Sequence, residues 1–98
     1  MDFNIIWSRI LDLKGTIFRT AKNYELFYAI DDDCVLFSRA KGSEKEGADH
    51  ARARKDQVKK AFELLRQSQN PQIKDIHGVT TGPAYIFATF KDPRIGAI

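Results

Sequence analysis

The stretch GTIFRTAKNYELFYAIDDDCVLFSR, residues 15–39, decides the fold of this chain. It holds three apolar, aromatic-rich runs, and polar residues at 21–23 and 31–33 separate one run from the next. Short apolar runs punctuated by such turn residues are typical of consecutive antiparallel strands. The stretch therefore predicts a three-stranded antiparallel meander with turns at those two places.

The second and third runs of this stretch are apolar on both faces. In the second run, Tyr24, Leu26, Tyr28 and Ile30 point to one face, and Phe27 and Ala29 point to the other. In the third run, Cys34 and Leu36 point to one face, and Val35 and Phe37 point to the other. A sheet with one face in water shows polar residues at every second position. We therefore expect cover on both faces, from the chain's own helices and from a second copy in a homodimer.

Helical periodicity appears on both sides of the meander. Segment 2–14 has apolar residues at helical spacing, Asp2 as its cap and Gly15 just past its end. Segment 56–68 carries a second apolar stripe, and residues 83–91 form a short helix that is apolar nearly all round. Such a helix is either deeply buried or shared with a second subunit.

Residues 48–55 fit two structures. Their alanine content favours a backward extension of the following helix, whereas the alternation of His50, Arg52 and Arg54 with alanines favours a fourth strand. Both interpretations stay open. The order of elements predicts an α+β fold with a meander of three or four strands, one long helix and a short C-terminal helix.

The composition is that of one globular domain, residues 1–98. The chain is 43% hydrophobic and 30% charged, which excludes a disordered protein. Its single cysteine, Cys34, lies inside an apolar run and is expected to be a buried thiol. Because no signal-peptide pattern and no apolar run near eighteen residues occur, we expect a cytoplasmic protein without a membrane segment.

The charge is unevenly distributed. Residues 1–33 carry four basic and six acidic side chains, whereas residues 34–98 carry twelve basic and seven acidic ones. The candidate surface for nucleic acid or an acidic protein consists of Arg52, Arg54, Lys55, Lys59 and Arg66. The alternative is a solvated helix face, in which pairs such as Asp56 with Lys60 account for the charges.

An aromatic surplus suggests a second kind of site. Seven Phe, three Tyr and one Trp are present. They predict either a pocket for a small apolar ligand between the sheet and the last helix, or core and dimer interface alone. In the pocket interpretation, Tyr24, Tyr28 or Tyr85 supplies a polar group. This would make the protein a ligand binder or an enzyme.

Other constellations predict no chemistry. The triplet at 31–33 is typical of a tight turn, and His50 and His77 lack neighbours at ligand spacing. Cys34 has no partner that would activate a nucleophile, and the glycines are too dispersed for a phosphate loop. We predict no catalytic residues, no metal and no cofactor, and a binding module rather than an enzyme; a purely structural assembly or inhibitor protein is a third possibility.

One dispersed pattern carries a resemblance. Its parts, in order, are Trp7, Leu13-x-Gly15-x-x-Phe18-x-Thr20, Phe27, Arg54, Ala61 and Gly82-Pro83-Ala84-Tyr85-Ile86. In this order the chain resembles small uncharacterised prokaryotic proteins of mobile elements, including integron gene cassettes. The resemblance implies a compact α+β domain that often self-associates and has no established activity. Proteins in such settings include regulators, toxin-antitoxin components and DNA-modification partners, so the resemblance favours the nucleic-acid interpretation without naming a residue.

Overall fold

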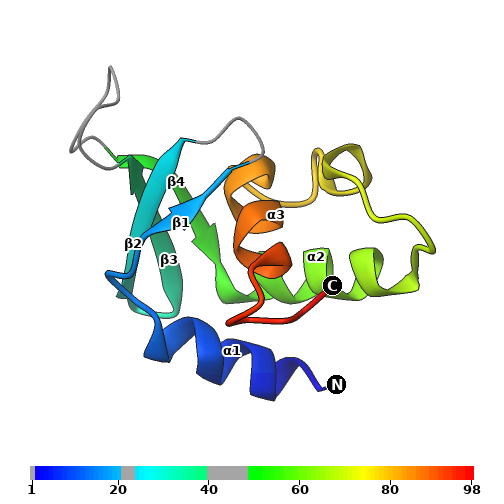
Figure 1. The fold of residues 1–98 in the computed structure, drawn as a ribbon, viewed down its shortest axis with the longest axis horizontal. Helices are drawn as coiled ribbons and strands as arrows, with labels where there is room; N and C mark the ends of the chain where they lie inside the picture. The colour runs from blue at the N-terminus through cyan, green and yellow to red at the C-terminus, as the bar shows by residue number, and fades with distance from the viewer. Residues whose placement is uncertain (1, 21–23, 40–48) are drawn as a thin grey trace.

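The computed structural model describes residues 2–20, 24–39 and 49–98, and its elements confirm the α+β class (Figure 1). In chain order the elements are α1 (Phe3–Asp12), β1 (Phe18–Arg19), β2 (Glu25–Asp31), β3 (Cys34–Arg39), β4 (Asp49–Arg54), α2 (Lys55–Gln67), the 3-10 helix η1 (Ile73–Ile76) and α3 (Pro83–Lys91). The turn predicted at 21–23 and the polar segment 40–48 lie outside the described residues.

The four strands form one antiparallel sheet in the order β1-β2-β3-β4. Residues 49–54 are therefore a strand, which settles the open choice for that segment. The turn between β2 and β3 has Asp32 and Asp33 at its centre, with φ of 51° and 60°. Two successive residues of positive φ match the right-handed twist of a hairpin, and aspartate tolerates that conformation better than most residues. The predicted turn at 31–33 is confirmed.

The helices begin and end close to the predicted residues. The backbone N–H of Asn4 donates to Asp2 Oδ1 at 3.0 Å at the start of α1. Past its end, Gly15 adopts a φ of +80° and its N–H donates to the carbonyl of Tyr28 at 2.9 Å. Within the described residues, none of the helices combines the length and the apolar character needed to cross a bilayer.

The start of α3 requires a glycine for two reasons. Gly82 precedes Pro83 with a φ of +63°, a conformation that side chains disfavour. A Cβ atom on Gly82 would also lie 2.6 Å from the Cβ of Ala51 on β4. The chain can therefore bring α3 against the sheet only because this residue has no side chain.

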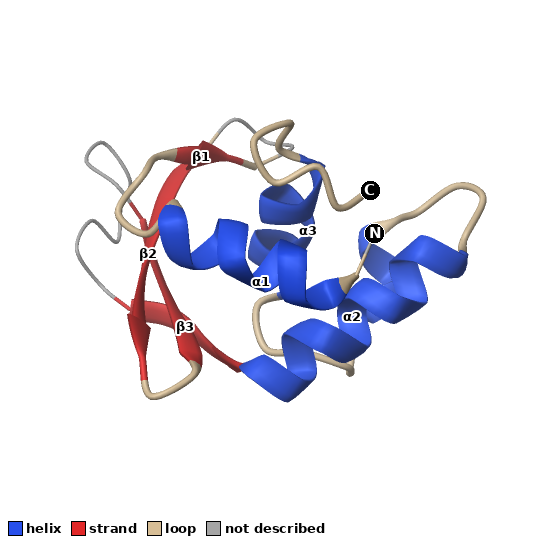
Figure 2. Ribbon diagram, turned by 90° about the horizontal axis from the view of Figure 1, so that it is seen from below, coloured by secondary structure: helices blue, strands red, loops and turns tan. Residues whose placement is uncertain are grey.

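The α-helices that the structure describes, α1, α2 and α3, lie on one face of the sheet (Figure 2). On this covered face, Tyr28 and Phe37 are 1% exposed. On the opposite, outer face, Phe27 and Leu36 are half-buried and Ala29 is exposed. The chain's own helices thus cover one face, and the expected cover of the outer face by a second copy stays a prediction. Cover goes to the face with the larger rings, because burying them removes the most apolar surface from water.

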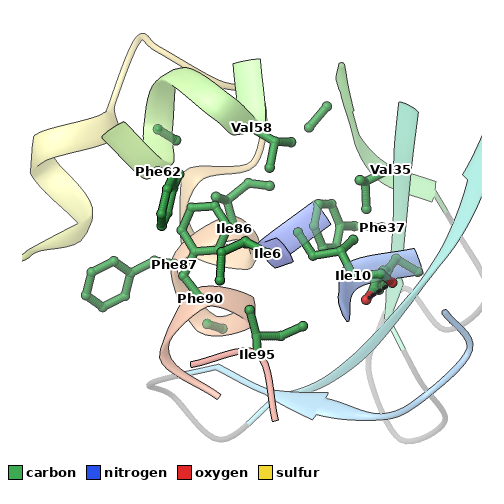
Figure 3. Packing of buried hydrophobic residues seen from close by; sticks show 14 of the residues in the cluster. Ile6, Ile10, Val35, Phe37, Val58, Phe62, Ile86, Phe87, Phe90 and Ile95 are labelled. Carbon is green, nitrogen blue, oxygen red and sulfur yellow. Dashed lines mark hydrogen bonds between the residues drawn. The ribbon is translucent and has the colours of Figure 1, made fainter. Parts of the chain in front are cut away.

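The core lies between the covered face and the helices, as Figure 3 shows. Phe62 of α2 meets Phe90 of α3 edge to face, with 6.0 Å between the ring centroids. Ile6 and Ile10 of α1 close the core from a third side. Residues 86–90 of α3 are all buried. The apolar surface all round α3 is thus explained by burial within this chain.

Candidate ligand-binding groove

A groove of about 620 Å³ runs along α3. The segment from Ile17 to Tyr24, at the β1–β2 end of the sheet, forms the opposite wall through its described residues. Its volume falls within the range of about 300–1,000 Å³ that is usual for small-molecule sites. The groove lies between the sheet and the last helix, where the aromatic-pocket hypothesis placed it.

Small side chains on α3 leave the space open. Ala84 and Ala88 are four residues apart and therefore share one side of the helix, which lines the groove. Ile17 and Tyr24 stand on the opposite wall, and they are 41% and 46% exposed. Large apolar side chains that remain this accessible beside a hollow are typical of a binding surface. The groove therefore has apolar walls that no described residue covers.

A cation lies between two phenol rings at one end of the groove. Arg39 Nε donates to the hydroxyl oxygen of Tyr85 at 3.3 Å, and its guanidinium carbon is 4.8 Å from the ring centroid of Tyr24. Arg39 is in register with Leu26, so it continues the row of the covered face past the buried core. The Tyr85 ring in turn packs 5.7 Å from the ring of Phe37. These contacts hold a positive charge at the rim.

The other end of the groove carries Lys91 and Arg94. Arg94 binds both carboxylate oxygens of Asp92, at 2.8 and 2.9 Å, and donates to the carbonyl of Ile17 at 2.8 Å. The hydrogen bond from Arg94 lowers the pKa of Asp92, and burial opposes that shift only in part. Lys91 Nζ lies 5.5 Å from the ring centroid of Phe87, and within the described chain no carboxylate pairs with it.

The lining is strongly cationic. Among its described residues are four basic side chains and a single carboxylate, that of Asp92, which Arg94 already binds. A second acid, Glu25, pairs with Arg19 at 3.0 Å on the rim. A cleft with one sign of charge and apolar walls concentrates the field inside it. The arrangement can therefore hold an anion together with an apolar body.

The three predicted pocket tyrosines do not lie together. Tyr24 and Tyr85 line the groove, whereas Tyr28 is 1% exposed in the core. The Tyr28 hydroxyl donates to the carbonyl of Ile10 at 2.5 Å, and burial raises the pKa of this phenol far above its usual value. Alternation placed Tyr28 on the correct face of the strand. It did not show that α1 covers this part of the face.

Sequence reasoning missed the cations of the groove. Arg39, Lys91 and Arg94 line it, and none of them was assigned to a pocket. For Lys91 a signal existed, because it lies three and seven residues after the alanines of α3 and thus shares their side of the helix. Arg39 had no such signal, since its partner Tyr85 is 46 residues away.

The five residues of the predicted basic surface lie in two regions. Arg52 and Arg54 belong to β4, where they meet Asp31 at 3.6 Å and Asp56 at 3.2 Å. The other three lie along α2, on the helical side of the sheet. There, Lys55 is 5.3 Å from the ring of Trp7, Arg66 is 5.2 Å from the ring of Phe62, and Lys59 lines a shallow hollow.

No family model, no curated protein and no solved structure matches this chain. In the part of the chain that the structure describes, no three His, Cys, Asp or Glu side chains gather as a metal site would require. The functional argument therefore rests on the geometry and charge of the groove.

Proposed function

We propose that this protein is a non-enzymatic, cytoplasmic binding module that acts as a homodimer. Its groove binds a small organic anion, a carboxylate or a phosphate ester, that carries a flat aromatic or branched apolar body. One observation carries this proposal: Arg39, held between Tyr24 and Tyr85, lines the same apolar groove as Lys91.

Each part of this ligand has a counterpart in the groove. The guanidinium of Arg39 offers planar donors that suit carboxylate and phosphate oxygens. The exposed ring of Tyr24 and the alanine side of α3 offer apolar contact to a flat body. Lys91 adds a second positive charge. No acidic side chain of the described residues pairs with it, so a ligand anion has none to displace. A neutral ligand of the same shape would gain no attraction from either positive charge.

Nucleic acid is supported less well than a small anion. Binding a phosphate backbone requires several basic side chains along one continuous surface. The five candidates divide between β4 and α2, and both arginines of β4 contact aspartates. The experiment below therefore also tests binding of an acidic macromolecule, a DNA duplex, as the competing hypothesis.

The test compares 2-naphthoate with its uncharged analogue 2-naphthamide in a titration followed by ¹H–¹⁵N correlation spectra. We expect naphthoate to shift the amide signals of Thr20, Ala84 and Ala88, and to bind at least about fivefold more tightly than naphthamide. Such a ratio corresponds to roughly 1 kcal/mol, a reasonable value for one partly exposed charge contact.

Two variants and one control locate the binding. Ala88→Trp fills the groove, Lys91→Glu reverses one charge, and both should weaken naphthoate binding about tenfold or more. Lys59→Glu makes the same charge reversal on α2 and should leave it unchanged. A random DNA duplex at low salt is the second arm. If duplex binds, Lys59→Glu weakens it and naphthoate shifts nothing, the proposed ligand class is wrong.

A further inference from the structure

The outer face of the sheet has an ordered pattern of apolar and charged residues. Pairing places Ala29 of β2 beside Leu36 of β3, and Leu36 beside Arg52 of β4. The next row along the strands is Asp31, then Cys34, then Arg54. An acidic side chain thus stands on one flank of β3, basic side chains stand on the other, and apolar residues lie between them.

Within one chain these charges are only weakly engaged. Arg52 and Asp31 approach to 3.6 Å across β3, with side chains 55% and 64% exposed. Ion pairs this accessible contribute little to stability. Of the described helices, none covers this face (Figure 2). The pattern is therefore available to a partner that presents the opposite order of charges.

A second copy of this chain presents that opposite order. We propose that the outer face packs against the same face of a second copy, about a twofold axis that runs along β3. Such an axis lays β2 of one copy over β4 of the other, because rotation exchanges the two flanks of β3. Asp31 then faces Arg54 of the second copy, the reverse pair forms as well, and Leu36 meets its own counterpart. The inference rests on the homodimer in the proposed function and names its surface.

Other surfaces fit a second copy less well. Antiparallel pairing of β4 with its own copy at the sheet edge would bring arginines of the two strands together, and like charges opposed across strands repel. At the other edge, Arg94 already binds the carbonyl of Ile17. Residues 86–90 of α3, which are apolar apart from Thr89, are buried within the chain. Of the described surfaces compared, face-to-face packing is the one that pairs opposite charges and covers apolar surface.

The test uses two charge-reversal variants. Two copies of the same variant should repel each other at the contact, whereas one copy of each variant should attract. Asp31→Arg opposes two arginines at each contact, and Arg54→Asp opposes two aspartates. Both changes are on exposed residues, and aspartate is a preferred residue at position 54, the N-cap of α2. We expect sedimentation equilibrium to show at least about a tenfold increase in the dimer dissociation constant for each variant alone. A 1:1 mixture should restore it to within about threefold of the unmodified protein, because each contact then pairs an arginine with an aspartate.

Lys59→Glu, on α2, is the matched control and should dimerise like the unmodified chain. If the unmodified protein stays monomeric at millimolar concentration, both the homodimer and the surface are wrong. If it dimerises and the single variants do so equally well, another surface is used and the homodimer stands. If each variant alone is monomeric and the mixture is too, the twofold arrangement along β3 is wrong. Naphthoate binding is measured separately, so the groove is judged on its own result.

Discussion

The two faces of the sheet have the same strands but different environments. On the covered face, Tyr28 and Phe37 stack with 5.7 Å between their ring centroids, beneath three helices. On the outer face, their chain neighbours Phe27 and Leu36 are half-buried. Adjacent residues of one strand thus differ in how much of their side-chain surface becomes buried on folding. The comparison teaches that apolar alternation specifies which residues share a face, and that helix placement decides what each face contributes to stability.

The largest expected effect comes from two neighbours on β3. Phe37→Ala should lower the free energy of unfolding by about 3–5 kcal/mol, because it removes a buried ring and leaves a cavity. Leu36→Ala should lower it by about 1 kcal/mol or less, since the side chain is already partly in water. Urea denaturation at micromolar concentration measures both. Equal losses would show that the two faces contribute alike.

A second test concerns Gly82, where the start of α3 lies against Ala51 of β4. Gly82→Ala should cost about 1–3 kcal/mol, because its Cβ would clash with Ala51 and its φ is positive. Gly78→Ala is the matched control: its φ of +80° is similarly strained, but nothing lies within 4 Å of the new Cβ. The difference between the two variants in thermal unfolding isolates the packing contribution. No difference would mean that α3 can move away from β4 without loss.

A third test compares two tyrosines of the covered face. Tyr28→Phe should cost about 1–2 kcal/mol, because it leaves the carbonyl of Ile10, in the last turn of α1, without its hydrogen bond in a buried place. Tyr24→Phe removes an exposed hydroxyl and should change stability by less than about 0.5 kcal/mol. Chemical denaturation gives both values. A larger loss from Tyr24→Phe would contradict the burial assigned to Tyr28.

The smallest expected effects come from two ion pairs. Asp92 is 16% exposed and 2.8 Å from Arg94, whereas Asp31 is 64% exposed and 3.6 Å from Arg52. Asp92→Asn should cost up to about 1 kcal/mol at pH 7, and Asp31→Asn close to nothing. Both substitutions keep the side-chain shape, so a similar loss at both sites would contradict the comparison.

The Asp92 effect should depend on pH in one direction. Its pKa is lower in the folded protein than its ordinary value of 3.8, so the unfolded chain binds more protons in that range. The stabilisation is therefore present above pH 3.8 and disappears as the pH falls through the lower, folded value. Unfolding curves of the Asp92→Asn variant and the unmodified chain should converge there. A difference that persists at the lowest pH would show that shape, rather than charge, holds this turn.

Local patterns were sufficient to predict most of the secondary structure. Asp2 and Gly15 marked the ends of α1, and the aspartate triplet marked a hairpin, because each of these depends on a few adjacent residues. The secondary structure of residues 49–54 could not be predicted, since alternating alanine and arginine suits a helix and a strand alike. Pairing with β3 decides between them, and pairing is not a local property.

The groove was predictable in part. Aromatic excess indicated a pocket beside the last helix, and Tyr24 and Tyr85 do line the groove found there. Its charges were not predictable, because Arg39 meets Tyr85 through the tertiary fold and Arg94 reaches Ile17 across 77 residues. The resemblance to proteins of mobile elements stays a prediction.

The order of the elements along the chain has a consequence for biosynthesis. The sheet is complete at Arg54, and each strand pairs with its neighbour in sequence, so its strand contacts are local and it can form early. Two of the three helices that cover its aromatic face, α2 and α3, are synthesised afterwards. While α3 is still inside the ribosomal exit tunnel, we expect Phe37 and Tyr28 to be open to chaperones and to neighbouring nascent chains. We therefore expect the yield of folded protein to depend on temperature mainly through this interval, in which α3 is not yet available to cover the aromatic face.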